Sequence, residues 1–184
     1  AQFLSPRTNQ REDHHGGDDA GRLRFAAEVV ASVREGAGPS LPLLARLSAS
    51  EQVEGGLGVD DGKRLARWLE GQGIAALHVV SGSACDAPPW YYQHMSLPPG
   101  VNASFARELR QGAAVPVIAA GRMGDPGEIE RVVGQGWADL VALGRPLVAD
   151  PDLPRKLREG HPERVVRCGG CLQGCLLGVK SGAG

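Results

Sequence analysis

The sequence predicts an α/β fold, because short apolar runs alternate with stretches of helical periodicity. The four expected strands cover residues 42–48, 75–82, 115–121 and 139–144, and each run ends at a Gly or a Ser. Such runs are typical of strands buried on both faces of a parallel sheet. Strands that alternate with helices in this way form either an open doubly wound sheet or a (β/α)8 barrel.

The expected helices carry their own signals. Apolar residues recur at helical spacing over 23–33, and again at Leu65, Trp68 and Leu69. Asp125 is the expected N-cap of a helix with Pro126 at its first position. The same Asp-Pro signal recurs at the start of 150–160, which is therefore expected to open another helix.

The number of strands limits how the sheet can close. A fifth strand ending in "AQFLS" is conceivable at the N-terminus, whereas a closed barrel needs eight strands. No G-x-G-x-x-G follows the first strand, which weakens the dinucleotide-binding open sheet. We therefore expect an open sheet or part of a barrel.

Composition excludes several classes of partner. The formal net charge is −1 over 184 residues and no run of Lys and Arg stands out, so we expect neither a nucleic-acid partner nor an anionic membrane surface. No apolar stretch approaches the roughly 20 residues that span a bilayer, and no signal peptide is recognisable. Three of the four cysteines cluster, which favours a cytoplasmic metal or redox site over a disulfide framework.

Two strand ends carry the same dipeptide. Gly121-Arg122 and Gly144-Arg145 follow consecutive expected strands and should be neighbours in space. Glycine lets a backbone N–H approach an anion closely, and arginine adds a charged donor fork. The pair predicts a phosphate site, as is common after the last two strands of a barrel; ordinary strand ends with a solvated arginine are the alternative.

Two further polar residues lie inside expected strands. Arg46 either points to a polar ligand at the mouth of the sheet or forms a buried ion pair with an acidic residue of a neighbouring strand. His78 is interpreted as a core histidine whose ring nitrogens are satisfied.

Cys168, Cys171 and Cys175 form C-x2-C-x3-C, with glycines that permit sharp turns. Three thiolates on one loop indicate a metal or iron–sulfur site, although both structural zinc and iron–sulfur clusters usually take four protein ligands. Cys85 is too distant in sequence to be assigned as the fourth. The alternative to a metal or iron–sulfur site is three thiols that bind no ligand.

These segments, in this order, resemble the Old Yellow Enzyme family of flavin oxidoreductases. The resemblance runs from "QFLSPRTNQREDHHGG" through "LLARLS", "LHVVSG" and "VPVIAAGRM" to "ADLVALGRPLVADPDLPRKL". It implies a TIM (β/α)8 barrel, present here as a fragment covering roughly strands 4–8 plus a cysteine-rich loop. It also implies FMN, with Arg46 beside the pyrimidine edge of the flavin and with Gly121, Arg122, Gly144 and Arg145 at its phosphate.

The cysteines resemble those of the iron–sulfur branch of that family, which includes 2,4-dienoyl-CoA reductase and trimethylamine dehydrogenase. The resemblance implies that Cys168, Cys171 and Cys175 bind a [4Fe-4S] cluster whose fourth cysteine lies beyond Gly184. It divides the chain into a flavin-binding half-barrel at 1–160 and a truncated iron–sulfur segment at 161–184. The catalytic acid is expected upstream of residue 1, and FAD and NAD(P)H would bind through a further C-terminal region.

The resemblance thus implies an FMN-dependent oxidoreductase that passes electrons between FMN and the cluster. It would reduce an activated C=C bond of a small-molecule substrate with electrons from NAD(P)H, as a cytoplasmic enzyme that could act as a homo-oligomer. The rival interpretation is a non-catalytic α/β module with a cysteine-ligated zinc.

Overall fold

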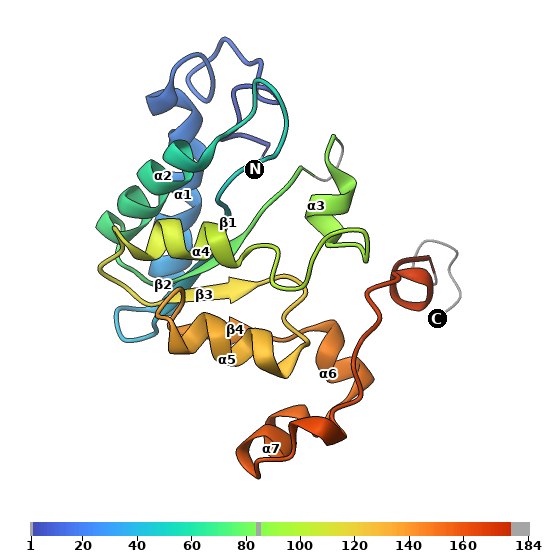
Figure 1. The fold of residues 1–184 in the computed structure, drawn as a ribbon. Helices are drawn as coiled ribbons and strands as arrows, with labels where there is room; N and C mark the ends of the chain where they lie inside the picture. Colours follow the sequence, from blue (N-terminus) through green and yellow to red (C-terminus); the bar gives the residue numbers. More distant parts are fainter. Residues whose placement is uncertain (1, 84–85, 178–184) are drawn as a thin grey trace.

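The structure is a computed structural model that describes residues 2–83 and 86–177. Those residues form a parallel sheet of β1 (Leu43–Ser48), β2 (Ile74–Val80), β3 (Val117–Ala120) and β4 (Leu140–Ala142), paired in chain order (Figure 1). Each strand falls on one of the four predicted apolar runs. The predicted α/β class and the parallel sheet are therefore confirmed.

Helices form over the predicted stretches 23–33 and 65–69 and after Asp125, whereas the helix over 103–110 was not predicted. Asp18 caps α1 by accepting a hydrogen bond from the Gly21 N–H at 2.8 Å, and Asp125 caps α5 by accepting one from the Glu128 N–H at 3.1 Å. The longer helices are α1 (Asp19–Ala37), which precedes β1, and the connecting helices α2 (Val59–Gly71), α4 (Ala103–Arg110) and α5 (Pro126–Gly134).

The elements that follow β4 are short. They are α6 (Arg145–Ala149), α7 (Leu153–Arg158), a 3-10 turn η1 (Pro162–Arg164) and a π-helical turn η2 (Gln173–Leu177). The second Asp-Pro signal was wrong about the start of a helix, because α7 begins at Leu153, with Asp152 at the N-cap position and without a side-chain capping bond. Asp150 instead ends α6, and its carboxylate accepts hydrogen bonds from later residues.

The conceivable N-terminal strand does not form in the described residues. Gln2–Leu4 make a turn, in which the Thr8 hydroxyl donates to the Gln2 carbonyl at 2.9 Å. Phe3 stacks on Phe25 of α1, with ring centroids 4.1 Å apart. Local hydrogen bonds and this stacking fix the segment as a turn against α1.

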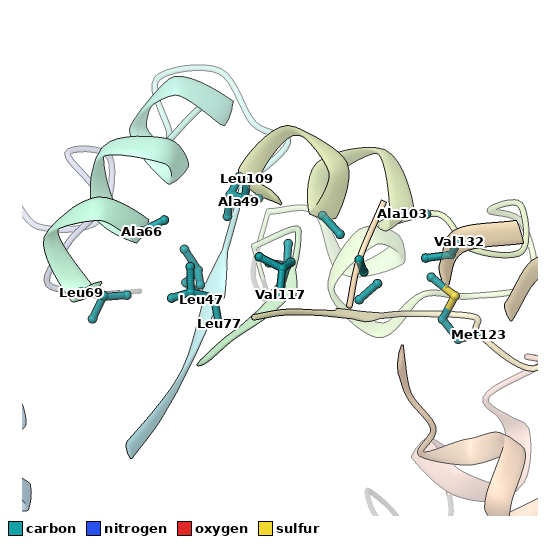
Figure 2. Close-up of a cluster of buried hydrophobic side chains, with 14 of the residues drawn as sticks. Leu47, Ala49, Ala66, Leu69, Leu77, Ala103, Leu109, Val117, Met123 and Val132 are labelled. Atoms are coloured by element: carbon teal, nitrogen blue, oxygen red, sulfur yellow. The ribbon is translucent and has the colours of Figure 1, made fainter. Parts of the chain in front are cut away.

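The core lies between one face of the sheet and the helices. Leu47, Leu77 and Val117 belong to this face and are nearly or fully buried. Figure 2 shows them beside Ala66 and Leu69 of α2, with Leu109 and Ala103 of α4 nearby. Burial of this apolar surface is the main stabilising contribution to the fold.

The opposite face of the sheet is covered only in part by the described residues. Strand register places Leu44 and Arg46 of β1 on this face together with His78 of β2 and Leu140 of β4. Leu44 is 58% exposed and Leu140 is 54% exposed. Burial on both faces was thus the wrong expectation for these residues, because the described helices pack on one face only.

No helix within residues 2–83 and 86–177 has both the length and the apolar character needed to cross a membrane.

Candidate functional site

A cavity of about 470 Å³ opens where the strands end and their following loops begin. Its volume lies within the range of about 300–1,000 Å³ that is common for small-molecule sites. It brings together all five residues that the sequence predicts to contact the cofactor, and one of the three cysteines. Those lining residues are Arg46, Gly121, Arg122, Gly144, Arg145 and Cys168.

Gly121 has a structural reason to be glycine. Its φ is +110°, a conformation that side-chain-bearing residues rarely adopt, and a Cβ there would lie 2.5 Å from the Nδ2 of Asn102. Asn102 is fully buried and donates from that amide to the Ala120 carbonyl at 2.7 Å. The backbone at the end of β3 therefore turns toward the cavity, and the hydrogen-bonded Asn102 side chain packs against this turn.

Two arginines point buried, unpaired donors into this region. Arg145 donates through Nη2 to the carbonyls of Tyr92 and Gln93, both at 3.0 Å, whereas its Nη1 has no partner among the described residues. The Nε and Nη1 of Arg122 are likewise buried without a partner there. Unsatisfied buried N–H groups are costly, so an acceptor group of a ligand would be stabilised beside them.

The charge around the cavity is positive. Four arginines line it, and Asp125 is the one acidic residue among its lining residues. Asp125 is already paired with Arg167, whose Nη1 lies 2.7 Å from its carboxylate. The remaining guanidinium groups favour an anionic ligand such as a phosphate.

Arg46 and His78 face each other in strand register on the open side of the sheet. Arg46 forms no ion pair within residues 2–83 and 86–177, so the alternative of a buried ion pair was wrong. Burial lowers the pKa of His78, and the nearby positive charge of Arg46 lowers it further.

His78 is not the satisfied core histidine that the sequence suggested. Its Nε2 is buried without a partner among the described residues, and the residue lines the cavity. Sequence reasoning also missed Gln93, which lines the cavity with a φ of +47° and gives no local signal in the sequence.

The cysteine-rich segment returns to the cavity after α7. The Val166 N–H donates to the Asp150 carboxylate at 2.8 Å, and residues 167–170 then line the cavity. Cys168 is partly buried at its wall, whereas Cys171 and Cys175 are exposed. Cys85 and residues 178–184 lie outside the described residues.

The three thiols do not form a compact single-ion site. Thiolates around one tetrahedral zinc lie about 3.8 Å apart, given Zn–S bonds of about 2.3 Å. The three Sγ atoms are not all within 4.8 Å of one another. Among the described residues, one group does meet that spacing, Asp13, His14 and His15, but Asp13 is paired with Arg11 and His15 with Glu28.

Comparison with known proteins supports the assignment of the chain as part of a TIM barrel. Residues 1–164 match the family model described as the NADH:flavin oxidoreductase / NADH oxidase family. The chain is 37% identical to an NADH oxidase from Thermoanaerobacter brockii over 96% of its own length. It is 32% identical to a cinnamate reductase from Clostridium sporogenes over 95% of its length. It spans only 27% and 28% of those two relatives.

Solved structures agree with these relatives. A 2-naphthoyl-CoA reductase in complex with 2-naphthoyl-CoA superposes with a TM-score of 0.89 and 33% identity, covering 97% of this chain and 27% of that one. A histamine dehydrogenase from Rhizobium sp. 4-9 gives a TM-score of 0.78 and 30% identity, covering 92% of this chain and 24% of that one. The structural neighbours are TIM barrels, of which the described sheet forms one part.

Proposed function

The chain belongs to the NADH:flavin oxidoreductase / NADH oxidase family, and we propose that it forms part of an FMN-dependent oxidoreductase that passes electrons between FMN and a [4Fe-4S] cluster. The observation that supports this proposal is that one cavity is lined both by the five predicted flavin contacts and by Cys168. The division into a flavin-binding part at 1–160 and an iron–sulfur segment at 161–184 is part of this proposal.

The residues present fit FMN. The family binds FMN, and the cavity offers unpaired buried donors on Arg122 and Arg145, which suit a phosphate. The φ of Gly121 brings the backbone to the same place without a side chain. Arg46 would hold its charge beside the pyrimidine edge, where it favours the negatively charged reduced flavin. Bound FMN would supply the hydride chemistry, and the protein would bind, orient and tune it.

The donor set of the cysteine-rich segment fits an iron–sulfur cluster. Cys168, Cys171 and Cys175 would supply three of its thiolate ligands. Cys168 also lines the cavity, so a cluster bound there would adjoin the flavin site.

Two relatives indicate a class of substrate. The names of the cinnamate reductase and the 2-naphthoyl-CoA reductase denote reduction of conjugated carboxylic acid derivatives. We propose that the enzyme reduces an activated C=C bond of such a small molecule with electrons from NAD(P)H.

FMN titration of the apo form of the native full-length protein tests the phosphate assignment. Arg145→Ala should weaken FMN binding about tenfold to a hundredfold, because a hydrogen bond to a charged group contributes about 1.5–3 kcal/mol. Arg110→Ala is the matched control, since Arg110 pairs with Asp139 outside the cavity. Unchanged FMN affinity in Arg145→Ala would refute the assignment.

Iron and acid-labile sulfide, measured after anaerobic purification, test the cluster. Cys168→Ser should lose iron and the broad visible absorbance of the cluster. Stoichiometric zinc in a colourless protein would instead favour the zinc-binding module.

A further inference from the structure

Arg122 contacts the cysteine-rich segment as well as the cavity. A Cβ on Gly170 would lie 2.2 Å from the Nη1 of Arg122 and 3.2 Å from its Cζ. Gly170 is buried, has a φ of +68°, and stands between Cys168 and Cys171. The guanidinium therefore occupies the space that any side chain at position 170 would need.

The backbone of Arg122 is held in an uncommon conformation to reach this place. Its φ of +53° is left-handed, a region that non-glycine residues enter at a cost. The residue follows Gly121 directly, so the turn at the end of β3 aims this side chain at the cysteine-rich segment.

The charge of Arg122 is also uncompensated. Its Nε and Nη1 are buried without a partner among the described residues, and no carboxylate there forms an ion pair with it. Asp125, the acidic residue of the same cavity, is paired with Arg167 instead. Arg122 as a whole is only partly buried, but a buried donor atom without an acceptor is unfavourable, so an anionic group is expected beside these two nitrogens.

We propose that Arg122 is a positioning residue for the cysteine-bound cluster: its guanidinium lies beside the cluster, donates toward its sulfur atoms and raises its reduction potential. This inference rests on the proposed [4Fe-4S] cluster and adds a role to the phosphate contact. A thiolate-ligated cluster gains one negative charge on reduction, and a nearby, partly buried cation stabilises that reduced form. Net charge and hydrogen bonds to sulfur are established determinants of cluster potential.

The decisive variants are Arg122→Gln and Arg122→Lys in the native full-length protein, with the cluster potential measured by redox titration monitored by electron paramagnetic resonance. Arg122→Gln removes the charge and should shift the reduction equilibrium at least tenfold toward the oxidised cluster, which is ~59 mV for one electron. Arg122→Lys keeps the charge and should retain most of the parent potential. Arg167→Gln is the matched control, because that side chain is 64% exposed and already paired, so its effect should be much smaller.

A second pair of variants tests the contact without altering the arginine. Gly170→Ala should displace the guanidinium and lower the cluster potential or release iron. Gly160→Ala is the matched control, because Gly160 also has a positive φ, of +78°, but a Cβ there meets nothing within 4 Å; it carries the backbone strain without the contact and should keep the parent potential.

The possible outcomes separate this inference from the proposed function. A parent protein without iron would overturn both. A parent potential unchanged in Arg122→Gln and Gly170→Ala, with FMN affinity weakened as in Arg145→Ala, would leave the proposed function standing and assign Arg122 to the phosphate alone. If Arg122→Gln fails to fold, Gly170→Ala and Gly160→Ala decide the question.

Discussion

Asn102 joins two strand ends at the rim of the cavity. The Ser81 hydroxyl donates to its Oδ1 at 2.6 Å, and its Nδ2 donates to the Ala120 carbonyl at 2.7 Å. Asn102→Ala should lower the free energy of unfolding by about 2–4 kcal/mol, because two buried partners each lose a hydrogen bond. Urea unfolding measures this change. Ser81→Ala breaks one of the two bonds and should cost about half as much; equal stability of Asn102→Ala and parent would contradict the role.

His78 provides a pH-dependent readout of the same site. Burial is the larger cause of its lowered pKa and Arg46 the smaller, so Arg46→Met should raise that pKa while leaving it below the ordinary value of about 6.5. Because the pKa is lower in the folded state, the unfolded chain binds more protons as pH falls below about 6.5, and stability decreases there. Selective ¹³C labelling of histidine and an NMR titration measure the pKa; an identical titration in Arg46→Met would exclude the coupling.

At the scale of elements, Asp150 ties the cysteine-rich segment to the end of α6. Its carboxylate, 4% exposed, accepts hydrogen bonds from Lys156 Nζ at 2.7 Å and from the Val166 N–H at 2.8 Å. These contacts, with the lysine first, hold the pKa of Asp150 below its usual range. A carboxyl with a lowered folded pKa stabilises above the unfolded value of about 3.9, and that contribution is lost as pH falls below it.

Asp150→Asn should therefore flatten the loss of stability below about pH 4 and loosen the segment at neutral pH. Tryptic cleavage after Arg167 should become faster, since the Val166 N–H loses a charged acceptor. Asp152→Asn is the control, because Asp152 pairs with Arg155 at the surface, where both side chains are 56% exposed. Equal cleavage rates in the two variants would disprove the tether.

The elements that the sequence predicted are those whose signals are local. Apolar runs located all four strands, and Asp125 located the start of α5. Helix α4 was missed although its buried residues Ala103, Ala106 and Leu109 recur at helical spacing, because the helix is only eight residues long and follows a long Pro-rich loop. Asp150 was wrongly predicted as an N-cap. Its carboxylate instead accepts hydrogen bonds from Lys156 and Val166, and these contacts depend on tertiary structure.

At the scale of the whole molecule, the candidate site was predictable where the chain brings residues together by simple topology. Parallel strands place their ends at one edge, so Gly121-Arg122 and Gly144-Arg145 had to be neighbours. The approach of Gly170 to Arg122 was not predictable, because it depends on the path of the segment after α7.

The open side of the sheet leads to a last prediction about the isolated 184-residue chain. Within the described residues β1 and β4 each have one strand neighbour, and Leu44 and Leu140 are more than half exposed on the uncovered face. Free strand edges beside exposed apolar side chains promote association between chains. The chain expressed alone should therefore form oligomers or aggregates, and sedimentation velocity at several concentrations measures their fraction.

Replacing both leucines by lysine should increase the monomer fraction, because charge on that face opposes association. Val148→Lys is the control: Val148 is 82% exposed but lies on α6, away from the sheet. A monodisperse monomer with a cooperative thermal transition would show that the open face needs no partner.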